Sequence, residues 1–192
     1  MKRLFVAMHV ADSTAEKLLA VQAELERVPP GAAEKIRPVA HQALHLTLKF
    51  LGETDEGRLA DLEQAVQALA ARTRPIEAHV AGVSAFPDTR RPRAVFAALT
   101  AGAGAVMALA EELEVICDDL GFPAENRLRV PHVTLARVDN ARPAGELTDW
   151  IAERAKIDFG PVAGNNIVLY ESKLQQTGSI YTALIAPTLG GG

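Results

Sequence analysis

The sequence predicts an α+β fold in which antiparallel sheets and flanking helices form two pseudo-symmetric lobes around a central cleft. The main observation is a repeat: the segment HLTLKF at residues 45–50 returns as HVTLAR at residues 132–137. Strand and helix patterns also follow one another in much the same order in both halves. No linker rich in Ser or Gly separates the halves, so we expect residues 1–192 to form a single domain.

The first half is expected to alternate between strands and helices. Ser13 and Glu16 have the spacing of a capping box at the start of the first helix. In both copies of the repeat, apolar residues occupy alternate positions, which is the period of a strand. The predicted elements are a strand over 3–11, a helix from Asp12 that stops at 29–31, a connector over 36–39, a motif strand ending at Gly52 and a helix from 54 to 72.

The second half is expected to imitate this order. A turn at 87–92 is dense in Pro and Arg, and Gly121 is a natural left-handed cap for the helix before it. The predicted elements are strands over 75–86 and 93–100, a helix over 103–120, the second motif strand after Pro131, a helix over 143–156, a hairpin of strands 166–174 and 179–187, and a frayed terminus at 190–192.

Composition limits the class of protein. With 48% apolar and 23% charged residues the chain is expected to be globular. Its net charge of −4 argues against a protein that binds nucleic acid through a generally basic surface, but it allows a local basic patch at the entrance of a site. Cys117 is the single cysteine, so no internal disulfide can form and a cytoplasmic location is the default. We expect Cys117 to be a small buried apolar residue. The apolar start reads as a strand, and no run reaches the ~20 residues of a membrane span.

Each copy of the repeat places a histidine and a threonine on one face of a strand. His45 and Thr47 share a face because side chains alternate, and so do His132 and Thr134. Two imidazoles can act together as acid and base near neutral pH, and two hydroxyls can hold oxyanion oxygens. Hydrolysis of a phosphodiester fits this set. A single His-x-Thr is usually structural, but two matched copies favour a functional site.

Other chemistries fit less well. No Ser or Cys has the setting of an activated nucleophile. Each strand offers one imidazole, and no clustered Asp, Glu or His spacing completes a metal site, so neither a metal nor another cofactor is expected.

Two cations follow the motifs. By strand parity Lys49 lies on the His45 face and is a candidate phosphate neighbour, with a surface lysine as the alternative. Parity puts Arg137 on the opposite face from His132, so Arg137 reaches a phosphate only if a bulge turns it, and otherwise makes a structural ion pair.

Several residues have two interpretations. If the ligand is a nucleic acid, Phe50 could stack on a base and the cluster Arg90, Arg91 and Arg93 could line its entrance; otherwise Phe50 belongs to the core and the arginines are solvated turn charges. The remaining histidines, which are His9, His41 and His79, lie in no repeated context, and we expect them to be structural or surface residues.

The motifs HLTLKFLGE (45–53) and PHVTLARV (131–138), with KRLFVAMHV near the start and LYESKLQQTGSIY at 169–181, resemble the two-histidine (2H) phosphoesterase superfamily. Within it the chain is most similar to the RNA 2',3'-cyclic phosphodiesterases, once described as 2'-5' RNA ligases. The resemblance covers nearly the whole length. One departure is Arg37-Pro38, where the family often has an aromatic residue before the first motif.

The resemblance implies a bilobal LigT-like fold and metal-free opening of a terminal 2',3'-cyclic phosphate to a 2'-phosphate. His45 would be the general acid on the departing 3' oxygen and His132 the general base on water, a division that the symmetric motifs alone leave open. Thr47 and Thr134 would hold the phosphate oxygens. The partner would be RNA with a cyclic phosphate end, or a cyclic nucleotide, and the protein a monomer.

Two alternatives remain at this point. The same acid and base could join RNA halves through a 2'-5' bond when a 5'-hydroxyl replaces water. The chain could also be a binding module that recognises RNA ends or a phosphorylated ligand without turnover.

Overall fold

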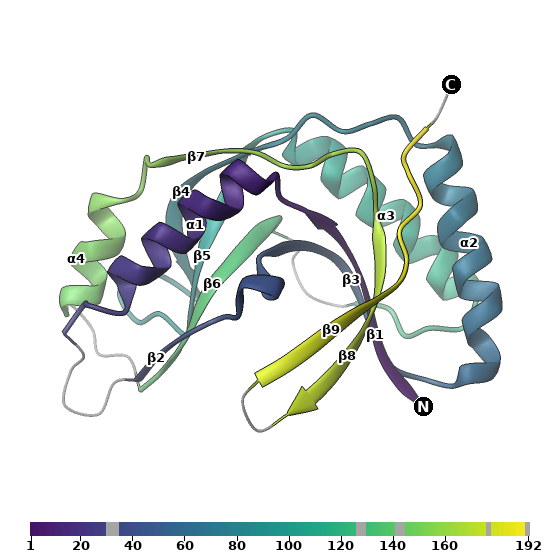
Figure 1. Ribbon diagram of the computed structural model, residues 1–192, viewed down its shortest axis with the longest axis horizontal. Coiled ribbons are helices and arrows are strands. Elements are labelled where there is room, and N and C mark those ends of the chain that lie inside the picture. Colours follow the sequence, from purple (N-terminus) through teal and green to yellow (C-terminus); the bar gives the residue numbers. More distant parts are fainter. Residues whose placement is uncertain (30–34, 126–129, 141–144, 176–177, 191–192) are drawn as a thin grey trace.

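The computed structural model describes residues 1–29, 35–125, 130–140, 145–175 and 178–190 (Figure 1). The elements are β1 (Lys2–His9), α1 (Asp12–Leu25), β2 (Lys35–Pro38), η1 (His41–Ala43), β3 (His45–Thr54), η2 (Glu56–Arg58), α2 (Leu59–Arg72), β4 (His79–Phe86), β5 (Ala94–Ala101), α3 (Ala103–Asp119), β6 (His132–Asp139), α4 (Glu146–Glu153), β7 (Asp158–Pro161), β8 (Val168–Gln175) and β9 (Gly178–Ile185).

In this part of the chain the strands form one nine-stranded sheet. Its order is β7-β4-β5-β6-β3-β1-β8-β9, with β2 paired to the far end of β6, and every strand pair is antiparallel. The two motif strands β3 and β6 are adjacent at the centre, where Leu46 and Val133 are partners. The predicted α+β plan with antiparallel pairing is confirmed, and the sheets of the two predicted lobes are the two halves of one sheet.

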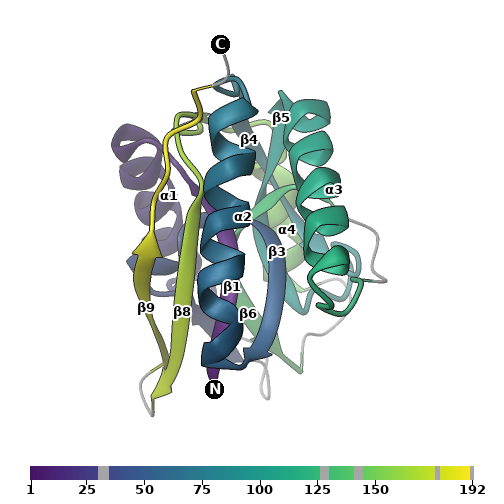
Figure 2. The same cartoon turned by 90° about the vertical axis from the view of Figure 1, so that its right-hand side faces the viewer.

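The four α-helices of the described residues cover one face of this sheet. Residues of all four belong to one apolar core together with Leu46 and Val133, which lie on the same side. Helix α3 packs on β3, α1 packs on β2, β6 and β7, α4 packs on β4, and α2 lies beside α3 (Figures 1 and 2). Thus α1 follows β1 but covers the β6 half, and α3 follows β5 but covers the β3 half. This exchange of helices ties the two halves together.

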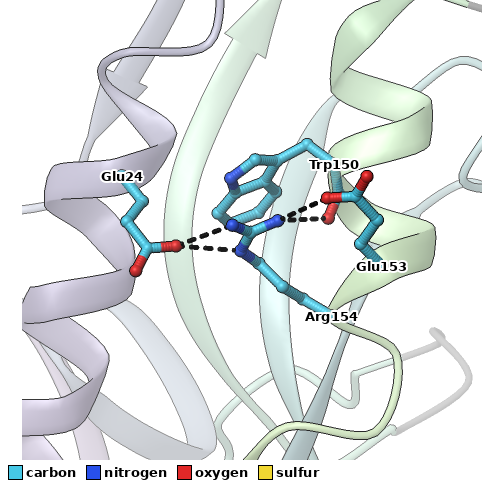
Figure 3. A network of polar contacts seen from close by, with 4 residues as sticks. All are labelled: Glu24, Trp150, Glu153 and Arg154. Atoms are coloured by element: carbon cyan, nitrogen blue, oxygen red, sulfur yellow. Dashed lines mark hydrogen bonds and ion pairs between the residues drawn. The ribbon is translucent and has the colours of Figure 1, made fainter.

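Arg154 ties α4 to α1 on the β6 half (Figure 3). Its guanidinium lies 4.4 Å over the Trp150 ring, and its Nε and Nη2 donate to Glu24 Oε2 at 3.0 and 2.8 Å. Its Nη1 donates to the Trp150 carbonyl and to Glu153, both at 3.2 Å. A planar cation can make these contacts together because its donors point outward while its face stacks.

The structure corrects one local prediction. Helix α1 has Ala11 at the N-cap, whose carbonyl accepts from the N–H groups of Thr14 and Ala15 at 2.9 Å. Ser13 therefore lies inside the first turn, and the predicted capping box was wrong because the helix begins too early in the chain for Ser13 to cap it. By contrast, Gly121 has φ 75° directly after the end of α3, which confirms the predicted cap.

Two strands were missed and some expectations cannot be compared. β2 was predicted as a connector and β7 as part of no element, because four residues carry too little alternation to be recognised. Helix α1 ends at Leu25, short of the predicted stop at 29–31. The start of the predicted helix at 143–156, the tip of the C-terminal hairpin and the last two glycines lie outside the described residues. Cys117 is buried as expected, and burial raises its thiol pKa to about 11. Among the described helices, none has the length and hydropathy to cross a membrane.

Candidate active site

The four motif side chains gather where β3 meets β6. Leu46 and Val133 face the core, so the flanking His45, Thr47, His132 and Thr134 face the open side of the sheet. Continuing the antiparallel register places His45 opposite Thr134 and Thr47 opposite His132. The two histidines are then diagonal neighbours, a relation that separates backbones by about 7 to 8 Å. This register brings the two His-Thr pairs onto the same face of adjacent strands.

The surroundings of His45 are aromatic and enclosed. Its ring stacks on Phe5 with centroids 4.9 Å apart, and Tyr181 meets it edge-on at 5.5 Å. Burial lowers the pKa of His45 to about 4; a hydrogen bond to the Gln42 backbone opposes this shift, and the nearby His9 and His132 rings add to it. In the unliganded protein His45 is thus neutral at neutral pH.

His132 has a similar but lighter enclosure. Phe86 meets its ring edge-on at 5.0 Å and Phe96 lies at 5.2 Å. Its Nδ1 lies 2.6 Å from the Val130 carbonyl, which fixes Nδ1 as the donor and leaves Nε2 for chemistry. Burial lowers the pKa of His132, the bond to Val130 opposes this, and the charge of Arg137 lowers it further.

A bulge follows the threonine in each motif strand and reverses parity. Val6 pairs with Lys49 and Ala7 with Thr47, so Leu48 has no partner on β1. On β6, Val95 pairs with Ala136 and Phe96 with Thr134, so Leu135 is skipped in the same way. In each strand two successive residues then face the core, and the next residue returns to the His-Thr face.

The parity prediction for Lys49 was therefore wrong. Lys49 is fully buried on the helix side, where its Nζ donates to Glu114 Oε1 at 2.8 Å and to the Pro123 carbonyl at 3.2 Å. Glu114 Oε1 also accepts the Glu125 N–H at 3.0 Å. Lys49 thus anchors the segment that follows α3, behind the sheet and away from His45.

For Arg137 and Phe50 the bulges have the opposite effect. Arg137 returns to the face of His132 and is exposed. This is the bulge that the prediction from sequence required if Arg137 is to reach a phosphate. Phe50 holds the equivalent place beyond Thr47; it is 58% exposed, with its ring 6.1 Å from Phe5. Phe50 is therefore not a core residue.

The remaining sequence candidates lie elsewhere. The exposed Arg90, Arg91 and Arg93 are on or beside the β4–β5 turn, where Asp88 Oδ1 accepts the backbone N–H groups of Arg90 and Arg91. Over the described residues, no group of three or more His, Cys, Asp or Glu side chains could hold a metal ion.

Sequence reasoning missed His9 and Tyr170. His9 is the β1 partner of His45, and its Nε2 lies 2.5 Å from the Tyr170 hydroxyl. His9 stands outside the repeat, and only the strand register shows that it lies beside His45.

Comparison with known proteins agrees with this arrangement. The family described as LigT-like phosphoesterase matches residues 9–96 and 100–181. A protein of Aeropyrum pernix named RNA 2',3'-cyclic phosphodiesterase is 33% identical over 149 residues, covering 78% of this chain and 84% of that protein. The crystal structure of TT0787 of Thermus thermophilus is similar at TM-score 0.79 and 30% identity, and that of E. coli LigT complexed with 3'-AMP at 0.77 and 25%, each covering 98% of both chains.

The buried position of Lys49 leads to a stability prediction. Lys49→Met removes the cation beside Glu114 and should lower the free energy of unfolding by about 3 kcal/mol. The double variant Lys49→Met/Glu114→Gln removes both charges and keeps an acceptor for the Glu125 N–H, so it should regain most of this loss. Urea denaturation measures both. Equal stability of wild type and Lys49→Met would contradict the assignment.

The lowered pKa of His45 leads to a pH prediction. Between pH 6.5 and 4 the unfolded chain binds a proton at this histidine and the folded chain does not, so stability must fall as the pH falls through that window. His45 accounts for a loss on the order of 3 kcal/mol in the free energy of unfolding over this window. In urea titrations at both pH values, His45→Gln should lose less stability than wild type. The exposed His41→Gln is the control and should follow wild type.

Proposed function

Because this chain belongs to the LigT-like phosphoesterase family, we propose that it hydrolyses the 2',3'-cyclic phosphate at the end of an RNA chain and leaves a 2'-phosphate. The observation that carries the proposal is the diagonal placement of His45 and His132 on one open face, each beside a threonine of the other strand. A phosphate between the two rings would have one imidazole on the side of the attacking water and the other on the side of the departing oxygen.

The reaction divides the two histidines into a base and an acid. His132 Nε2 takes a proton from water as the water oxygen bonds to phosphorus. As the bond from phosphorus to the 3' oxygen breaks, His45 gives that oxygen a proton. His45 must then be protonated when substrate is bound, and the negative charge of the cyclic phosphate favours this by raising the pKa of the adjacent imidazole. Each such transfer is worth about 10² to 10⁴ in rate.

Three further side chains suit the phosphate, and one suits the nucleoside. The hydroxyls of Thr47 and Thr134 face the same gap and can donate to the non-bridging oxygens. Arg137, on the His132 side, can balance the charge that these oxygens gain. The exposed ring of Phe50, on the His45 side, can stack on the terminal base. No step of this scheme uses a metal or another cofactor.

The site takes one His-Thr pair from each half, so we propose that the whole chain acts as a single catalytic domain and works as a monomer. Its partner would be RNA with a cyclic phosphate end, or a cyclic nucleotide. With a single, buried cysteine, the cytoplasm is the compartment we propose.

Removing either imidazole should abolish activity. His45→Ala and His132→Ala should each lower kcat on a 2',3'-cyclic nucleotide at least about 10³-fold. A chelator should leave wild-type activity unchanged. Circular dichroism and denaturation of each variant provide the control for folding. Wild-type kcat in either variant would refute the paired-histidine scheme.

Two alternatives are separated by a product assay. Wild type is supplied with 2',3'-cyclic, 3',5'-cyclic and linear 2'-5' linked substrates, and the products are identified by phosphorus NMR. We expect a 2'-phosphate from the 2',3'-cyclic substrate alone. A 2'-5' joined product from cyclic and 5'-hydroxyl RNA halves would favour a ligase, and tight binding with no product would favour a binding module.

A further inference from the structure

A third histidine adjoins the site. His9 and His45 are direct partners in the β1–β3 register, so their side chains lie next to each other on the open face. On its other side His9 meets Tyr170, whose hydroxyl lies 2.5 Å from His9 Nε2 with the rings 5.8 Å apart and nearly perpendicular. His9 therefore connects β8 to the strand that carries His45.

The other half of the pseudo-symmetric site has no such pair. On β5, Ala98 is the partner of His132 and so holds the place equivalent to His9. On β4, Phe86 is the partner of Ala94, and it corresponds to Tyr170, the β8 partner of Phe5. An imidazole and a hydroxyl beside His45 are thus replaced by a methyl and a plain ring beside His132.

Tyr170 is in contact with the rings that enclose His45. Its centroid is 5.0 Å from Phe5 with the planes only 18° apart, and 6.1 Å from His45. Phe5 is the ring on which His45 stacks. A bond from Tyr170 to His9 restrains the tilt of this set of rings, because a phenol with a hydrogen-bonded hydroxyl cannot slide past its neighbours freely.

His9 also acts on His45 through charge. When both are protonated the two rings repel each other, which contributes to the lowered pKa of His45. The ionisable groups around His9 are Asp12, His45 and Tyr170. Those around His45 are His9, His132, Tyr170 and Tyr181.

We propose that His9 and Tyr170 form a positioning pair that acts on the reaction through His45, and that this pair makes the two otherwise symmetric histidines chemically different. This inference rests on the proposed function. His9 holds Tyr170 in place, Tyr170 and Phe5 hold the His45 ring, and the nearby imidazole of His9 sets how readily His45 takes a proton. On the His132 side the equivalent positions hold Ala98 and Phe86.

Two variants separate the two effects. Tyr170→Phe removes the hydroxyl and keeps the ring, so kcat on a 2',3'-cyclic nucleotide should fall roughly tenfold while KM stays nearly constant. His9→Gln keeps an acceptor for the Tyr170 hydroxyl but removes the charge, so the titration midpoint of His45 should rise by roughly half a unit. The five histidine Hε1 signals are followed by proton NMR against pH and assigned by the loss of one signal in each His variant. His79→Gln, on β4 toward the far edge of the sheet, is the matched control for both readouts.

A merely structural pair would lower the melting temperature of both variants and leave kcat and the His45 midpoint unchanged, and that result would overturn the proposal. A shift of the His132 midpoint equal to that of His45 would also overturn it. The titration is measured without substrate, so it decides the link between His9 and His45 even if wild type hydrolyses no cyclic phosphate, which would end only the proposed function.

Discussion

The site depends on the contact between Leu46 and Val133, where the two motif strands pair at the centre of the sheet. Both side chains are fully buried among the helices, and burying two such residues is worth a few kcal/mol. Because side chains alternate along a strand, burial of these two residues forces the neighbouring histidines and threonines onto the open face. The same hydrophobic contact that joins the halves therefore assembles the polar quartet of His45, Thr47, His132 and Thr134.

The bulges at Leu48 and Leu135 decide which residues accompany this quartet. Regular strands would have put Lys49 beside His45 and turned Arg137 away from His132. Instead each strand buries two successive residues. Lys49 goes to the helix side to meet Glu114, and Arg137 and Phe50 return to the site. A single extra residue on each strand thus buries Lys49 as a structural cation and leaves Arg137 as the exposed cation on the open face.

The quartet is nearly symmetric, but its surroundings are not. Beyond the threonines, a cation on one side corresponds to an aromatic ring on the other. Beside the histidines, His9 and Tyr170 correspond to Ala98 and Phe86. The proposed hydrolysis needs one histidine to donate a proton and the other to accept one. Two identical environments would favour neither assignment of these roles. The differences between the halves are therefore the features that could give the two histidines the different roles proposed for them.

Much of this could be read from the sequence because the signals are local. The α+β class follows from periodicity, and the two His-x-Thr copies identify the central side chains, since both depend only on spacing along one strand. The strand partners and the bulges could not be read, because register is set by how β1, β5 and β6 fit their neighbours. That is why the face of Lys49 was predicted wrongly and His9 was overlooked. The sequence alone determined which residues could do the chemistry; the tertiary structure decided which of them share a face, because only the pairing of distant strands fixes the direction in which each side chain points.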